Sequence, residues 1–180
     1  MKYKNCPIGG IDLKLRTLIF LGPLVFLIHD LEEVFTVEQW VKGHESTLQK
    51  ITLAKVLFKS NGYTTIEFAV TVTFLFLMFV LISSSASKKI GWGMKCYLAA
   101  IFILFVNVFT HLAQTFFLQM YTPGVITALV VVLPYTVFVI VAVKRSQILN
   151  SRVFLQSMGI GVLFLPVIFA AMLIVHQLFI

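Results

Sequence analysis

Five stretches of this sequence are long and apolar enough to cross a lipid bilayer as helices. A spanning helix needs about 20 mostly apolar residues, and such stretches occur at 17–37, 63–83, 97–119, 124–143 and 155–179. Only 12% of the residues are charged and 59% are hydrophobic, whereas a soluble domain carries roughly 25% charged residues. The sequence therefore predicts an all-α integral membrane protein with a single helical domain over residues 1–180. It excludes a soluble enzyme, a disordered tail and a disulfide scaffold.

The connections between these stretches are short, apart from the first. Around Leu48 and Ile51, apolar and polar residues alternate in a way that favours a short amphipathic helix in the membrane interface. An ordinary polar loop is the alternative. We expect the serines at 83–85 to form a turn in the second loop, and residues 120–123 to form a tight turn between the third and fourth spans.

The distribution of basic residues predicts how the chain is oriented. Ten of its 14 Lys and Arg fall on the side of the N-terminus when the five spans alternate across the bilayer. The positive-inside rule then places the N-terminus in the cytoplasm and the C-terminus outside, in the cytoplasmic (inner) membrane. The net charge of +7 is explained by this topology and by contact with anionic membrane lipids, so we expect no nucleic acid partner.

The first span contains ionisable residues that a bilayer normally excludes. Its apolar part ends at Ile28, so a helix of spanning length must continue through His29, Asp30, Glu32 and Glu33. Intramembrane charges of this kind are costly and usually functional. His29, Glu32 and Glu33 have the i, i+3, i+4 spacing that places them on one helix face, where they could bind a metal or act as an acid and a base. A helix that ends near Ile28, with a solvated cap, is the alternative.

Other spans carry polar residues at a similar depth. Counted from the outer end of each helix, His29, Glu33, Glu67, His111 and His176 lie roughly 5–12 Å below the boundary at about 1.5 Å per residue, with Asn107 deeper. This coincidence predicts one shared site near the outer face. The alternative reading takes Glu67 and His176 as interfacial, Asn107 as a contact between helices, and His44 as a solvated loop residue.

The order of these residues resembles a known family. His29 and the glutamates at 32 and 33 read H-x-x-E-E, followed by Glu67, by Asn107-x-x-x-His111 and by Tyr121-Thr122-Pro123-Gly124. The pattern is similar to the HXXEE-domain family of small bacterial multi-pass membrane proteins over about residues 17–145. The resemblance implies a metal or active site built on the histidine and the two glutamates, and it implies no established activity.

Three functions remain open at this point. The first is a metal-dependent hydrolase that acts on a lipid or a membrane-borne peptide. Its metal ligands would be His29, Glu33, Glu67, His111 and His176, its catalytic residues Glu32, Glu33 and Asn107, and its metal a divalent ion, zinc first and iron or manganese next. The second is a proton or cation transporter that uses the same residues. The third is a non-enzymatic membrane partner, such as an immunity protein.

Overall fold

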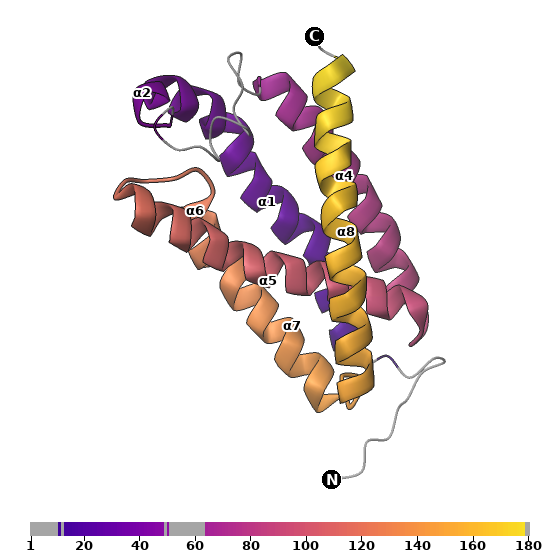
Figure 1. Cartoon of the computed structure of the whole chain (residues 1–180). Coiled ribbons are helices and arrows are strands. Elements are labelled where there is room, and N and C mark those ends of the chain that lie inside the picture. Colours follow the sequence, from indigo (N-terminus) through magenta and orange to yellow (C-terminus); the bar gives the residue numbers. More distant parts are fainter. Residues whose placement is uncertain (1–10, 12, 49, 51–63, 179–180) are drawn as a thin grey trace.

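All regular structure in the described part of the chain is helical (Figure 1). The computed structural model describes residues 11, 13–48, 50 and 64–178, apart from the side chains of residues 169, 172 and 176. The elements are α1 (Leu13–Gly43), α2 (Glu45–Leu48), α4 (Thr65–Ala86), α5 (Trp92–Leu118), α6 (Val125–Thr127), the π-helix η1 (Ala128–Val132), α7 (Leu133–Arg145) and α8 (Ser151–Leu178).

Four segments have the length and hydropathy of membrane spans. They comprise α4 with 22 residues, α5 with 27, the continuous segment Val125–Arg145 with 21, and Ser151–Val175 of α8 with 25. These segments match four of the five predicted spans, and the prediction of an all-α membrane protein is confirmed. Helix α1 has 31 residues, which is long enough, but its charged residues set it apart from the other four. Its crossing of the bilayer stays a prediction, as does the orientation of the chain.

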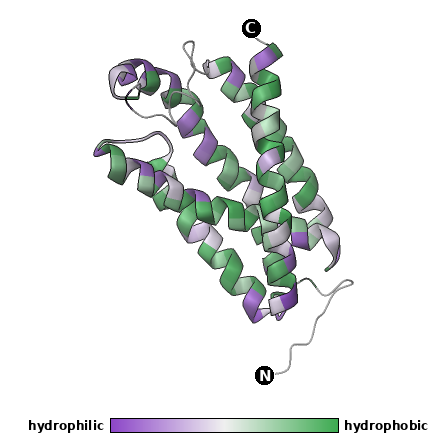
Figure 2. Ribbon diagram, in the orientation of Figure 1, coloured by the Kyte–Doolittle hydropathy of each residue, from purple (hydrophilic) through white to green (hydrophobic). Residues whose placement is uncertain are grey.

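The exterior of the bundle is largely apolar. Figure 2 shows hydrophobic residues along most of α4, α5, α7 and α8, with hydrophilic residues gathered toward the ends of the bundle and along the outer part of α1. Phe117 is 81% exposed and Leu163 is 72% exposed. Contiguous apolar surface of this extent is rare on soluble monomers, and it fits a lipid environment.

The second loop begins later in the chain than the sequence predicts. Residues 83–85 were expected in a turn, but they lie within α4, which continues to Ala86. The hydroxyl of Ser87 donates to the carbonyl of Ser84 at 2.9 Å, and this side-chain bond satisfies a carbonyl at the end of the helix. Serine is compatible with a helix end because its hydroxyl can bond to the backbone in this way. The short helix α2 ends at Leu48, where the predicted interfacial helix begins, and residues 51–57 of that helix lie outside the described residues, so it stays a prediction.

A missing side chain allows α1 to pack closely on α5 and α7. A Cβ atom on Gly22 would lie 2.9 Å from the hydroxyl oxygen of Tyr135 and 3.2 Å from the ring of Tyr97. The Tyr135 hydroxyl donates to the carbonyl of Leu18 at 2.7 Å, so the Tyr97 hydroxyl donates to Tyr135 across 2.6 Å. Leu18 lies five residues before Pro23, a residue within α1 that has no backbone N–H to donate.

A carboxylate of α1 holds the start of α4. The Oε2 atom of Glu38 accepts from the amide of Thr65 at 2.7 Å and also from its hydroxyl. The carboxylate therefore satisfies one of the amides that a helix N-terminus leaves without a partner. Hydrogen bonds from Lys42 and then from Thr65 lower the pKa of Glu38 from 4.5 to about 2. The C-terminal part of α1 and the N-terminus of α4 are joined at this point.

Candidate metal centre

Two histidines and one glutamate converge between α1 and α5. His29 and Glu33 lie one turn apart on α1, and His111 reaches them from α5. One ligand atom from each residue lies within 4.8 Å of the others. Nε2 of His111 is 3.0 Å from Oε1 of Glu33, and the two imidazole rings meet edge to face with their centroids 5.0 Å apart. His29 is 1% exposed and His111 is 5% exposed, so the group is largely shielded.

The side chain of Asn107 joins the two histidines. Its amide nitrogen lies 3.1 Å from Nε2 of His29 and 3.1 Å from Nε2 of His111. The hydroxyl of Thr110 donates to the backbone carbonyl of Asn107 at 2.7 Å and also lies 3.0 Å from its side-chain amide oxygen. An NH₂ group only donates, so these two contacts require lone pairs on both Nε2 atoms.

Hydrogen bonds that run from Glu32 through Thr127 to His29 determine which ring nitrogen of His29 carries the proton. The hydroxyl of Thr127 donates to Oε2 of Glu32 at 2.6 Å, and its oxygen lies 2.9 Å from Nδ1 of His29. Because the Thr127 proton is given to the carboxylate, the oxygen accepts from Nδ1–H of His29. The lone pair of His29 is therefore on Nε2, which faces Glu33 and His111. A carboxylate that orients a histidine in this way is a common feature around metal ligands.

Glu32 itself is held by other groups. Its Oε1 atom accepts from the hydroxyl of Tyr121 at 2.6 Å, and its Oε2 atom accepts from the backbone amide of Thr127 at 2.8 Å. Burial and, after it, the hydrogen bond to the Glu32 carboxylate raise the pKa of Tyr121 to about 12. Tyr121 thus remains a donor at neutral pH. The hydrogen bonds of Glu32 place it behind His29 and not among the three converging residues.

The turn after α5 brings the backbone close to the site. Gly124 has a φ of +84°, and a Cβ atom there would lie 2.6 Å from Oε1 of Glu33 and 2.7 Å from Cε1 of His111. Both the left-handed backbone and the close approach require glycine at this position. A tight turn is predicted at 120–123; the turn in the structure lies slightly later, where the amide of Val125 donates to the carbonyl of Thr122 at 3.2 Å, and it closes one side of the group.

The open side of the group faces a pocket of about 410 Å³. His29, Glu33, Asn107 and His111 line it, together with Gln114 and with Asp30, which the spacing argument did not select. Asp30 is 9% exposed. Among the described residues, its Oδ2 atom has no hydrogen-bond partner, and neither has Nδ1 of His111. A buried acid in the middle of a predicted span was the signal that could have identified Asp30.

Glu67, a predicted ligand, lies elsewhere, as does His44, which the sequence predicts to be a solvated loop residue. Glu67 is 4% exposed in the first turn of α4, and within the described residues it is not one of the three that converge. His44 lies 2.8 Å from the carbonyl of Trp40 through Nδ1 and is half-buried. His176 belongs to α8, but its side chain lies outside the described set. The structure thus brings together His29, Glu33, Asn107 and His111.

Comparison with known families identifies the family of the chain. A family model described as a protein of unknown function with HXXEE motif matches residues 20–139. The chain belongs to the HXXEE family. The match covers His29, Glu33 and His111, and also the turn that closes the site. No curated protein and no solved structure gave a significant match.

Proposed function

We propose that this HXXEE protein is a membrane-embedded, metal-dependent hydrolase that acts on a lipid. The supporting observation is that His29, Glu33 and His111 each bring one ligand atom within 4.8 Å of the others. The contacts of Asn107 require lone pairs on Nε2 of both histidines, and Oε1 of Glu33 lies 3.0 Å from Nε2 of His111. A proton on His111 Nε2 would satisfy Glu33, but it would remove the acceptor that Asn107 uses. A metal ion satisfies all three atoms together.

The donor set fits a catalytic metal site. Two imidazoles and one carboxylate are the three protein ligands of several zinc hydrolases, in which the fourth position stays open. Tetrahedral ligands about 2.0–2.1 Å from zinc lie about 3.3 Å apart, close to the 3.0 Å between His111 and Glu33. The same donors also suit iron or manganese. Binding would replace the two hydrogen bonds of Asn107, whose amide is then free to contact substrate.

A bound zinc ion would supply an activated water at neutral pH and would polarise a carbonyl. The residues of the chain have separate tasks. Asp30 presents a buried carboxylate oxygen to the same pocket, and we assign it to take up and return the proton of the attacking water. Glu32, acting through Thr127, keeps the lone pair of His29 directed at the site, so it is a positioning residue.

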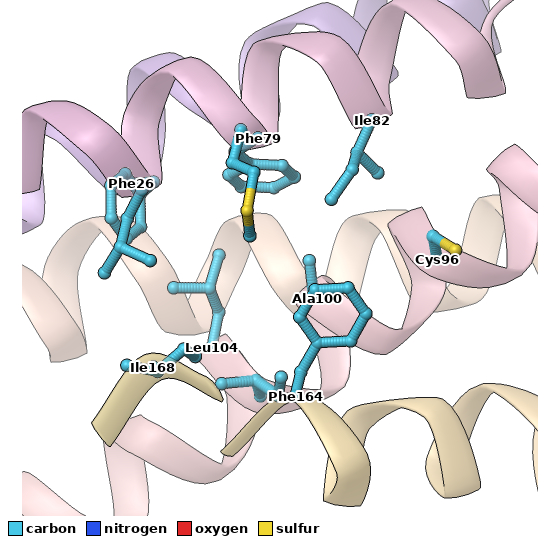
Figure 3. Close-up of a pocket in the computed structure, with 11 residues that line it drawn as sticks. Phe26, Phe79, Ile82, Cys96, Ala100, Leu104, Phe164 and Ile168 are labelled. Carbon is cyan, nitrogen blue, oxygen red and sulfur yellow. The ribbon is translucent and has the colours of Figure 1, made fainter. Parts of the chain in front are cut away.

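The pocket favours a lipid substrate. It adjoins a second, apolar pocket of about 80 Å³, and the two share five lining residues: Phe26, Leu75, Ile103, Leu104 and Ile168. Figure 3 shows side chains from α1, α4, α5 and α8 directed into the second pocket, with Cys96 at one end. An acyl chain could lie there while its ester linkage lies at the polar group. A transporter would need a polar path beyond the site, and the second pocket offers none.

Hydrolysis of esters by the purified full-length protein tests the proposal. The protein in detergent micelles would be given a panel of fluorogenic phospholipids and diacylglycerols, with a chelator and then with added zinc. We expect hydrolysis that the chelator stops and zinc restores. It should be lost in His111→Gln and in Asp30→Asn, and kept in the control His44→Gln. Bound zinc without hydrolysis of any ester, or hydrolysis that survives in His111→Gln, would overturn the proposal.

A further inference from the structure

A groove between α1 and α7 lies apart from the two pockets described above, on a part of the bundle that the proposed site does not use. Its volume is about 720 Å³. The groove begins between the first residues of α1 and the last residues of α7. These two helix ends lie in the lower part of Figure 1. One end carries Lys14 and Arg145, and the rest is lined mainly by aliphatic and aromatic side chains such as Leu18, Leu133, Val137 and Phe138.

The two bases at the end of this groove are available to a ligand. Both side chains are exposed, and no carboxylate lines the groove among the described residues. The nearby Arg16 differs, because its Nε atom donates to the carbonyl of Ser87 at 2.9 Å. A pair of cations on an apolar groove, with no acidic side chain on its walls, fits an anionic ligand.

Apolar residues that line the groove are partly exposed on the surface of the bundle. Val137 is 44% exposed and Phe138 is 68% exposed. From Leu133 to Arg145 the groove follows α7 for about 18 Å at 1.5 Å per residue, which is more than half of a hydrocarbon core about 30 Å thick. A ligand with one charged end and one long apolar end matches this combination.

We propose that the groove binds one anionic glycerophospholipid, with its phosphate between Lys14 and Arg145 and an acyl chain along Leu18, Leu133 and Phe138. Basic pockets between membrane helices recognise lipid head groups in this manner. The proposal is independent of the metal centre, because no residue of the groove belongs to that site. A free phosphate would gain the charge contacts without the apolar ones and should bind far more weakly.

Native mass spectrometry of the full-length protein tests this site with phosphatidylglycerol and with phosphatidylcholine of the same chains. We expect one phosphatidylglycerol to be retained by the wild type. Lys14→Gln with Arg145→Gln should weaken binding about 25-fold, which is about five-fold for each base. The matched control Lys88→Gln with Lys144→Gln removes the same charge from residues outside the groove, and it should retain the lipid.

A swap of the two bases separates charge from folding. Lys14→Arg with Arg145→Lys keeps both charges, and it should restore phosphatidylglycerol binding. Four results would overturn the proposal. In the first, phosphatidylcholine is retained as well as phosphatidylglycerol; in the second, the test pair and the control pair of glutamine substitutions lose phosphatidylglycerol binding equally. In the third, glycerol phosphate alone displaces the lipid, and in the fourth, a second copy of the chain binds in place of lipid.

Discussion

Replacing Gly124 with alanine should damage the candidate metal centre from the backbone side. The new Cβ atom would lie 2.6 Å from Oε1 of Glu33, whereas ordinary contact begins at 3.4 Å. The oxygen must therefore move by about 0.8 Å, while metal–ligand distances in well-formed sites vary by only about 0.2 Å. The left-handed φ of +84° adds strain of roughly 1–2 kcal/mol for a residue with a side chain.

We expect Gly124→Ala to weaken zinc binding roughly 10–100-fold and to lower the free energy of unfolding by the strain. Competition with a chromophoric chelator measures the first quantity, and unfolding in mixed micelles measures the second. Gly159→Ala is the matched control, because a Cβ there meets nothing within 4 Å. It should bind zinc like the wild type. If Gly124→Ala also binds zinc with unchanged affinity, Glu33 is not a ligand in the way we infer.

Three further predictions follow from individual contacts. Glu32→Gln should weaken zinc binding roughly 10–100-fold, because an amide holds Thr127 and the Nδ1 proton of His29 less well; unchanged affinity in the chelator competition would contradict the hydrogen-bond chain. The stabilising contribution of Glu38, whose pKa is lowered to about 2, should be complete above pH 4.5 and lost as the pH falls toward 2. Glu38→Gln should therefore flatten that part of a pH–stability profile, and a profile identical to that of the wild type would refute the capping contact. Tyr135→Phe should cost roughly 1–3 kcal/mol of unfolding free energy, and a variant as stable as the wild type would show that its two buried hydrogen bonds contribute nothing.

Hydropathy was sufficient to predict most of the fold. Long apolar runs require helices in lipid, because every backbone group must be satisfied within its own segment, so the predicted stretches agree closely with α4, α5, the continuous segment Val125–Arg145 and α8. Their ends were less predictable. The serines at 83–85 continue α4 to Ala86, and the hydroxyl of Ser87 then bonds to the carbonyl of Ser84, which composition alone does not reveal.

The site was predicted in part. Helical spacing put His29 and Glu33 on one face, and depth brought His111 to the same layer. Spacing could not show that Thr127 lies between Glu32 and His29, because that contact joins residues 98 positions apart. It also missed Gly124 and Asp30, whose importance depends on a close approach and on a pocket. Depth counting placed Asn107 below the other residues, and it did not predict that the side-chain amide lies 3.1 Å from Nε2 of both histidines.

X-ray absorption spectroscopy at the zinc edge, on the full-length protein loaded with one equivalent of zinc, tests the metal centre most directly. We expect nitrogen and oxygen ligands at about 2.0–2.2 Å, with the outer-shell scattering of two imidazoles, reduced to one imidazole in His111→Gln. A zinc ion surrounded by water alone, or a spectrum that His111→Gln leaves unchanged, would contradict a metal site formed by His29, Glu33 and His111.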